Sequence, residues 1–341
     1  MAYAYHFNAG KFAQLLACNA KEKFSVEHIH THVTQVKLGD DGAITALITD
    51  NNEELEFDFY IDCSGFESLL MSKALKIPFV DVSESLLINS ALVVQVPTKA
   101  DDAIPPYTLA TAHQAGWIWD IALTNRRGVG FVYSDNHMTD EQAHEKLDRY
   151  LGDSKQDLTY RKIPMRVGYR KKFWHKNCVA LGLAQGFLEP LEATSILLTD
   201  FSAKFLTLRF PSSTTQLEQL EERFNHAMGD AWERVIDFIK LHYCISGRTD
   251  SAFWIANKNQ DTISTSLKEK LNLWKEFTPV RDDFFSQFEV FYLENFLFVL
   301  YGMNYNTKAS NSPDKEQAHC LARLKQRAEI DHYLTSDLHK N

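Results

Sequence analysis

Several patterns that would place this chain in a simple class are missing. Its five cysteines are scattered and contain no CxxC pair, which excludes zinc ribbons and thioredoxin-like motifs and favours a reducing compartment. No stretch approaches the roughly 20 apolar residues of a membrane span, and MAYAYHFNAGKF has neither the basic nor the apolar region of a secretory signal. The net charge of −9, without a basic patch, argues against nucleic acid as a partner. We therefore expect a soluble, cytoplasmic protein without a membrane anchor.

Two common kinds of catalytic site are also missing. Ser64 follows a strand-like run but lacks the Gly-x-Ser-x-Gly elbow of serine hydrolases. His28, His30 and His32 alternate as on a strand, with no cysteine or carboxylate to complete a metal site. We expect these histidines to lie on a solvent-facing strand, and we expect no bound metal.

The first part of the chain indicates an α/β arrangement that starts in the middle of a unit. Asn8 is suited to cap a helix from about Ala9 to Ala20. Strand-like runs follow over residues 28–38, 42–50 and 55–63, and the last of them leads into Ser64-Gly65-Phe66.

The pattern changes twice further along. Residues 86–133 combine strand formers with turn residues, which predicts an antiparallel sheet, and residues 139–151 predict a helix with acidic residues in its first turn. Beyond Pro211 the pattern is helical, and helices are predicted over residues 213–228, 230–245, 264–277, 284–301 and 312–334. The chain is therefore expected to divide into an α/β domain over residues 1–213 and a mostly helical region over residues 214–341.

The segment Gly186–Ile196 (GFLEPLEATSI) carries the most chemical information. An apolar strand ends at a glycine, passes through a turn with two glutamates, and enters a helix at about Thr194. The unpaired N–H groups at a helix start favour an anion. Glu192 is the unexpected residue there, and from the residues alone a helix cap or another structural role is the favoured interpretation.

Two tryptophans, Trp117 and Trp119, alternate in the strand-like run GWIWDIA (Gly116–Ala122). Such alternation is usual for core packing. It would also make a rigid wall of two indoles on one face of a strand, so both interpretations stay open.

These two segments resemble the flavin-dependent tryptophan halogenase family. GFLEPLEATSI is similar to its FLEPLE-S-T-G-I segment, and GWIWDIA keeps three positions of its Trp-x-Trp-x-Ile-Pro signature, with Ala122 in place of proline. Three other stretches also resemble the family: YAYHFNAGKFAQLL near the start, Asp62-Cys63-Ser64-Gly65-Phe66, and LHYCISGRTDSAFW from Leu241. Together they extend from Tyr3 to about Gly302.

The resemblance implies a fold and a set of site residues. The fold would be the α/β (α+β) FAD/NAD(P)-binding type, with an incomplete Rossmann part, an antiparallel sheet and a helical C-terminal region on the substrate side. Glu192 would be catalytic, backbone amides of Thr194 and Ser195 would bind the halide, and Trp117 and Trp119 would separate flavin from substrate. The residues expected at the flavin are Val33, near its adenosine half, with Leu183, Gly186, Phe187 and Ile196. Ala193 and Ser195 depart from the family's serine and glycine.

The same resemblance implies the reaction. Reduced FAD from a separate flavin reductase, O2 and chloride or bromide would give hypohalous acid for electrophilic halogenation of tryptophan or another indole-like ring. Aromatic side chains of the helical part would hold that ring, and the candidates are Phe288, Phe291, Tyr292 and Phe296. Phe-rich helices are more often core, and a homodimer is left open.

Two parts of the family pattern are absent from these 341 residues. There is no GxGxxG turn for the flavin pyrophosphate, and the family's catalytic lysine has no counterpart. We therefore expect a truncated form that by itself binds FAD poorly and halogenates little. The alternatives are a flavin-dependent aromatic monooxygenase and a non-catalytic remnant that binds a partner.

Overall fold

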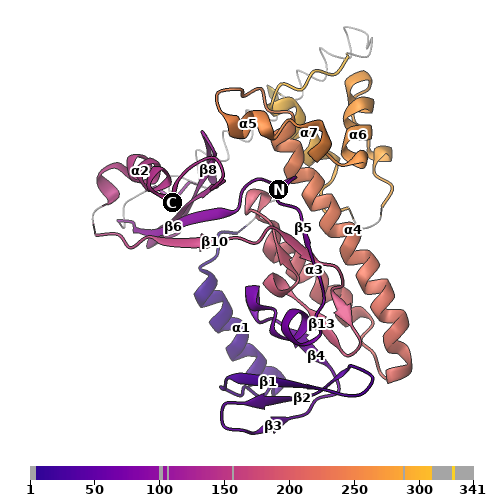
Figure 1. Ribbon diagram of the computed structural model, residues 1–341. Helices are drawn as coiled ribbons and strands as arrows, with labels where there is room; N and C mark the ends of the chain where they lie inside the picture. The colour runs from indigo at the N-terminus through magenta and orange to yellow at the C-terminus, as the bar shows by residue number, and fades with distance from the viewer. Residues whose placement is uncertain are drawn as a thin grey trace. The chain divides into compact units, whose positions relative to one another are not determined.

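The computed structural model describes residues 5–99, 103–105, 107–155, 157–286, 289–308 and 325–326. By its internal contacts the chain forms two compact units (Figure 1). The first comprises Met1–Ser264 and Ser286–Phe291, and the second comprises Thr265–Phe285 and Tyr292–Asn341. The domain division near residue 213 stays a prediction.

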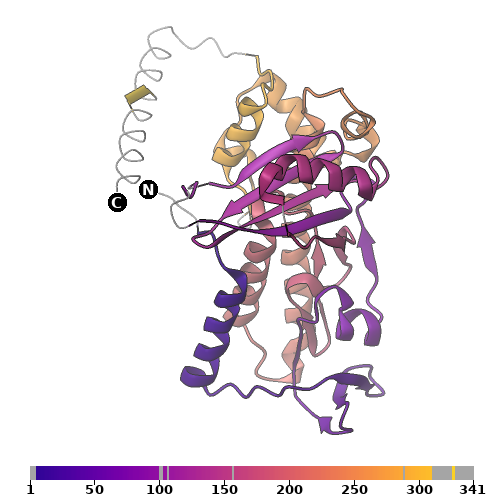
Figure 2. The ribbon, with the colours of Figure 1, turned by 90° about the vertical axis from the view of Figure 1, so that its left-hand side faces the viewer.

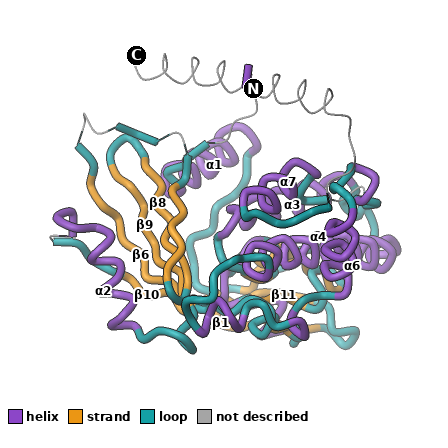
Figure 3. Tube along the Cα trace, turned by 90° about the horizontal axis from the view of Figure 1, so that it is seen from above, coloured by secondary structure: helices purple, strands orange, loops and turns teal. Residues whose placement is uncertain are grey.

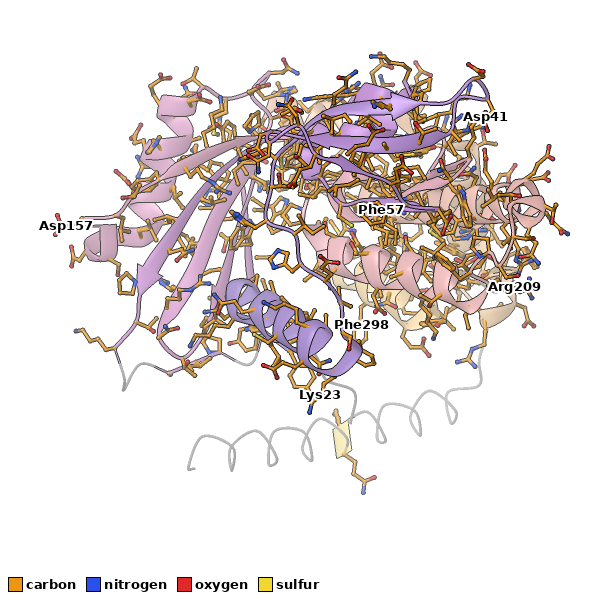
Figure 4. The ribbon with its side chains drawn as sticks, turned by 90° about the horizontal axis from the view of Figure 1, so that it is seen from below. Lys23, Asp41, Phe57, Asp157, Arg209 and Phe298 are labelled. Carbon is orange, nitrogen blue, oxygen red and sulfur yellow. The ribbon has the colours of Figure 1, made fainter. Side chains whose placement is uncertain are left out.

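The N-terminal helix α1 (Ala9–Phe24) starts where the sequence predicts. The side chain of Asn8 accepts a hydrogen bond from the backbone N–H of Lys11, which satisfies one unpaired donor of the first turn. Lys21 and Lys23 lie in the last turn, where positive charge is favoured, and Figure 4 shows Lys23 pointing outward. The helix buries no residue, and Leu15 and Leu16 are 65% and 52% exposed.

Three antiparallel strands follow the helix: β1 (Val33–Leu38), β2 (Ile44–Thr49) and β3 (Glu54–Leu55). The predicted first strand is too long, because His28, His30 and His32 precede β1. The single strand expected over residues 55–63 is also wrong. It divides into β3 and β4 (Tyr60–Asp62), because Tyr60 turns into a buried core and pairs with a distant strand.

The first unit also contains a small three-stranded sheet of the order β12-β13-β4. β12 (Trp174–His175) is antiparallel to β13 (Cys178–Ala180), whereas β13 runs parallel to β4. Parallel strands end at the same edge of a sheet, so Ser64 after β4 and Gly182 after β13 lie on the same side. The short helices that follow the two strands, η1 (Gly65–Glu67) and η4 (Gly182–Ala184), are in contact.

The predicted antiparallel sheet is confirmed, with five strands in the order β10-β6-β9-β8-β7. The strands are β6 (Ser90–Pro97), β7 (Leu109–His113), β8 (Gly116–Ala122), β9 (Arg126–Tyr133) and β10 (Arg161–Pro164). The helix α2 (Asp140–Leu151) lies along one face of the sheet (Figure 3). Thr139 caps α2 in a capping box with Gln142, which fixes its start one residue after the predicted one.

A fourth sheet leads to the helices of the first unit. It has the order β14-β11-β5, formed by β5 (Phe79–Asp81), β11 (Gly168–Arg170) and β14 (Gly186–Phe187). After β14 come α3 (Thr194–Leu208) and the long α4 (Leu217–Cys244), which pack together (Figures 1 and 2). The two helices predicted over residues 213–245 are thus one. An isolated glycine costs a helix only about 1 kcal/mol, and the buried residues on both sides of Gly229 outweigh that cost.

The second unit contains α6 (Thr265–Glu276) and α7 (Leu293–Gly302), around the fully buried Trp274. The helix predicted over 284–301 starts only at Leu293. Of the helix predicted over 312–334, the structure describes only residues 325–326. α5 (Ala252–Ala256) belongs to the first unit. The remaining short helices are η1 (Gly65–Glu67), η2 (Leu69–Ala74), η3 (Gly152–Lys155), η4 (Gly182–Ala184), η5 (Leu191–Ala193), η6 (Thr214–Gln216), η7 (Gln260–Thr262) and η8 (Arg281–Asp283). Within the described part of the chain, no helix combines the length and apolarity that crossing a membrane requires.

Candidate active site

The turn between β14 and α3 has an unusual backbone. Glu192 (φ 66°, ψ 7°) and Ala193 (φ 51°, ψ 36°) are consecutive residues in the left-handed conformation. For residues other than glycine this conformation costs on the order of 1–2 kcal/mol each. Such strain persists only where the surrounding structure holds it, and it is typical of functional sites.

The carboxylate of Glu192 contacts α4 rather than the start of α3. Its Oε1 lies 3.1 Å from Nε2 of His242, and the two side chains are 32% and 17% exposed. The N-cap residue of α3 is Ala193, and among the described residues no side-chain hydrogen bond caps this helix, so the interpretation of Glu192 as a helix cap is wrong. The backbone N–H groups of Thr194 and Ser195 are therefore left without a capping side chain, at a helix end that carries partial positive charge.

A pocket of about 200 Å³ opens beside this helix start. Among its lining residues are five that the sequence assigned to the flavin or the halide: Leu183, Gly186, Thr194, Ser195 and Ile196. Leu183 and Ile196 are 38% and 59% exposed, so the rim of the pocket is apolar. The structure thus brings these residues together, and their assignment to flavin and halide stays a prediction.

The other two expected flavin contacts lie outside this pocket. The ring of Phe187 packs edge-on against that of Phe66, with centroids 5.5 Å apart. This contact joins the end of β14 to the Ser64-Gly65 step after β4. Val33 opens β1 opposite Thr49, in the separate three-stranded sheet. Asp62, at the end of β4, is 1% exposed and accepts hydrogen bonds from the backbone of Ser64, Leu70 and Met71, so its role is structural.

Sequence reasoning missed Glu189, three residues before Glu192. Glu189 is 1% exposed. Its Oε2 accepts hydrogen bonds from Nε1 of Trp117 at 2.9 Å and from the hydroxyl of Tyr243 at 2.5 Å. Its Oε1 is buried and has no hydrogen-bond partner among the described residues. The signal in the sequence was a glutamate enclosed by Phe187, Leu188, Pro190 and Leu191, where a carboxyl group has little access to water.

Burial decides the charge of Glu189. Removal from water raises its pKa from 4.5 to about 7, while the hydrogen bonds from Trp117 and Tyr243 and the nearby His242 act in the opposite direction. Burial also raises the pKa of Tyr243 well above its usual value, and the adjacent carboxyl adds to that shift. The turn therefore carries two glutamates in unlike surroundings, one enclosed and one open.

The two tryptophans of β8 have different partners. Trp117 is 6% exposed and is held by Glu189. Trp119 lies across Gly130, its direct neighbour on β9, where an added Cβ would come within 2.3 Å of the indole. Gly128 lies under the same ring, and a Cβ there would be 3.3 Å away. Small residues on β9 thus make room for the Trp119 indole, whereas Trp117 reaches the turn that carries Glu192.

Of the substrate candidates, Phe288 lies outside the described residues. Phe291 is 6% exposed and stacks on Phe238 with centroids 3.9 Å apart, as a core side chain does. Phe296 packs against Trp274 in the second unit, and Tyr292 is 68% exposed. In the described ranges, no three His, Cys, Asp or Glu side chains are grouped to hold a metal ion.

Comparison with known proteins places the chain in a family. The sequence profile of the tryptophan halogenase family matches residues 1–318. The chain is 35% identical over 301 residues to tryptophan 6-halogenase SttH of Streptomyces toxytricini, covering 88% of this chain and 57% of that protein. It is 37% identical over 279 residues to tryptophan 6-halogenase ThaL of Streptomyces albogriseolus, covering 82% and 52%. The chain thus spans about half the length of these curated relatives.

Solved structures agree in fold. The crystal structure of tryptophan halogenase from Shewanella frigidimarina superimposes with a TM-score of 0.89 at 36% identity, over 96% of this chain and 66% of that one. The structure of SttH gives a TM-score of 0.90 at 31% identity, over 95% and 64%. The predicted flavoprotein-type α/β fold with an antiparallel sheet and a helical C-terminal region is confirmed. The chain belongs to the tryptophan halogenase family.

Proposed function

We propose that this chain carries the halide- and substrate-facing part of a flavin-dependent halogenase that acts on tryptophan or another indole-like ring. One observation supports this most directly: Glu192 stands in a strained conformation immediately before the uncapped start of α3. An acidic side chain and an anion-favouring helix end are thereby placed next to each other, with the carboxylate turned away from the amides. Halogenation needs both groups.

The residues present fit the ring end of a flavin. Leu183 and Ile196 expose apolar surface beside the backbone of Thr194 and Ser195, and a flavin ring needs both apolar faces and polar edge contacts. Bound reduced FAD, delivered by a flavin reductase, would activate O2. O2 would then supply the oxidising equivalent that converts chloride or bromide into hypohalous acid, with FAD left oxidised and the second oxygen atom released as water. Gly186 and Phe187 would border the ring and Val33 the adenosine half, whereas no GxGxxG turn for the pyrophosphate occurs in the sequence.

Glu192 would act on the halogenating agent and on the substrate ring. A carboxylate can accept a hydrogen bond from hypohalous acid and so fix its orientation. It also stabilises the positive charge that develops on the aromatic ring during electrophilic substitution. Trp117, fixed by Glu189, and Trp119 would form the wall that keeps the flavin apart from the substrate, which favours halogenation over direct oxygen transfer.

The halide site can be tested on the chain itself. Crystals soaked in bromide are expected to give an anomalous peak at the amides of Thr194 and Ser195. Anomalous peaks at other positions only would contradict the proposal.

The reaction needs a separate test. With reduced FAD, O2, bromide and either tryptophan or indole, mass spectrometry is expected to detect a small amount of brominated product that the Glu192→Gln variant does not form. The matched control is Glu222→Gln, which removes a carboxylate from an exposed position of α4 and should leave bromination unchanged. A hydroxylated product would instead favour the monooxygenase alternative.

A further inference from the structure

Two adjacent residues near the end of α4, His242 and Tyr243, contact the two glutamates of the turn, Glu192 and Glu189. Tyr243 donates to the buried Glu189, and the ring of His242 faces Glu192. His242 is itself fixed, because its Nδ1 lies 2.8 Å from the backbone carbonyl of Phe238, one helical turn earlier. The ring therefore has a defined orientation toward the turn.

These contacts determine where protons lie. A carbonyl oxygen only accepts hydrogen bonds, so Nδ1 of His242 carries a hydrogen. A neutral imidazole has a single N–H, which leaves Nε2 with a lone pair directed at Oε1 of Glu192. Two acceptors 3.1 Å apart do not form a hydrogen bond, so a proton lies between Nε2 and Oε1. Because imidazole is a stronger base than a carboxylate, Nε2 holds this proton, and the pair has zero net charge.

We propose that His242 is a positioning residue for Glu192, which keeps the pair neutral and draws the carboxylate away from the amides at the start of α3, so that a halide can bind them. The halide part of this proposal rests on the function proposed above. An unpaired carboxylate at that place would repel a halide, and it could also fold back and occupy the amides as a cap. His242 prevents both.

Two titratable groups of the same turn interact with His242. They are Glu192, in direct contact, and Glu189, whose ionised form a positive His242 favours. The arrangement explains how an acidic residue can immediately precede an anion site, because its charge is compensated from α4.

The proton can be located by nitrogen NMR of the histidine rings in the 341-residue chain. The signals of His242, assigned by their loss in His242→Asn, are expected to report hydrogens on both Nδ1 and Nε2 at neutral pH. In Glu192→Gln they should change to the neutral ring with hydrogen on Nδ1 only, because the amide can donate to Nε2. A ring with hydrogen on Nε2 alone, or identical spectra with and without the carboxylate, would overturn the proposal.

Chloride titration, followed by chlorine NMR line broadening, tests the consequence. His242→Asn should weaken chloride binding on the order of tenfold, since it leaves one uncompensated negative charge. The double variant His242→Asn/Glu192→Gln should regain the affinity. His226→Asn is the matched control, on the same helix with a side chain 81% exposed, and should not change it. His242→Gln replaces His242→Asn if the latter does not fold.

The two experiments separate the two proposals. Equal chloride affinity with and without His242, or no recovery in the double variant, contradicts the role of His242. If the unaltered chain binds no chloride, the proposed halide site is wrong, and the NMR measurement still decides whether His242 and Glu192 share a proton.

Discussion

Nε1 of Trp117 donates a hydrogen bond to Oε2 of Glu189 over 2.9 Å, although 72 residues separate them in the sequence. The contact fixes the indole of β8 against the turn that carries Glu192. Because Tyr243 donates to the same oxygen, one buried carboxyl group joins a strand, a turn and a helix. The pH dependence of the protein's stability depends on this carboxyl group.

The stability of the protein should fall between about pH 4.5 and 7 because of Glu189. Its pKa is raised in the folded state, so the folded protein binds the proton more tightly than the unfolded chain does. The resulting stabilisation is complete below pH 4.5 and is lost as the pH rises through 7. A shift from 4.5 to about 7 corresponds to about 3 kcal/mol. Urea unfolding at a series of pH values measures it, and Glu189→Gln should remove most of the slope.

Glu221→Gln is the matched control for that experiment. Hydrogen bonds from Lys172, the backbone of Lys176 and His175 outweigh the effect of burial and lower the pKa of Glu221. Its contribution is therefore present above the unfolded pKa and is lost as the pH falls. The Gln variant should lose stability at neutral pH and keep the slope between pH 4.5 and 7. An unchanged slope in Glu189→Gln would show that Glu189 is ionised throughout this range.

Gly130→Ala should displace the indole of Trp119. The new Cβ would lie 2.3 Å from a ring atom, so the ring must move at a cost of about 1–3 kcal/mol. Thermal unfolding and a shift in tryptophan fluorescence measure the change. Gly128→Ala on the same strand brings its Cβ only to 3.3 Å and should have a smaller effect. Equal effects of the two substitutions would contradict the close packing of Trp119 on Gly130.

Gly229→Ala should stabilise the protein by about 0.5–1 kcal/mol, because alanine loses less backbone freedom than glycine when a helix forms. Gly229 lies inside α4, and an added Cβ would meet no atom within 4 Å. The increase should appear in the midpoint of urea unfolding. If α4 were instead two helices that meet at Gly229, the substitution would be neutral or destabilising.

Lys240→Met should stabilise the protein most at neutral pH. Lys240 is 1% exposed and donates to the backbone carbonyl of Ser85 at 2.9 Å. Burial lowers its pKa from 10.5 to about 8, so between these values the unfolded chain binds more protons and stability rises with pH. Urea unfolding at pH 7 and pH 10 should show the advantage of the Met variant shrinking as the pH rises. Lys204→Met, at an exposed position of α3, should show no such trend, and a pH-independent effect at Lys240 would contradict this account.

Features that depend on neighbouring residues were predictable from the sequence. The cap at Asn8, the alternation of Trp117 and Trp119, and the strand–turn–helix order around Glu192 are all set by contacts within a few residues. The resemblance of the same short segments to a family was sufficient to predict the fold.

Other features were decided by packing between distant segments. The strand expected over residues 55–63 divides because Tyr60 pairs with Cys178 in another sheet, and the helix continues through Gly229 because both its halves are buried. Local preference is weak compared with the burial of a whole apolar face, so the sequence pattern misplaced these boundaries.

The sequence by itself determined that an acidic residue precedes an anion-favouring helix start. Only the tertiary structure decided what that residue does. His242 lies 50 residues beyond Glu192, and Trp117 and Tyr243 lie 72 and 54 residues from Glu189. Such partners meet only when β8, the turn and α4 pack together. Packing also removes water from Glu189 and leaves Glu192 partly open, and it is this difference in solvation that gives two glutamates of one turn different chemistry.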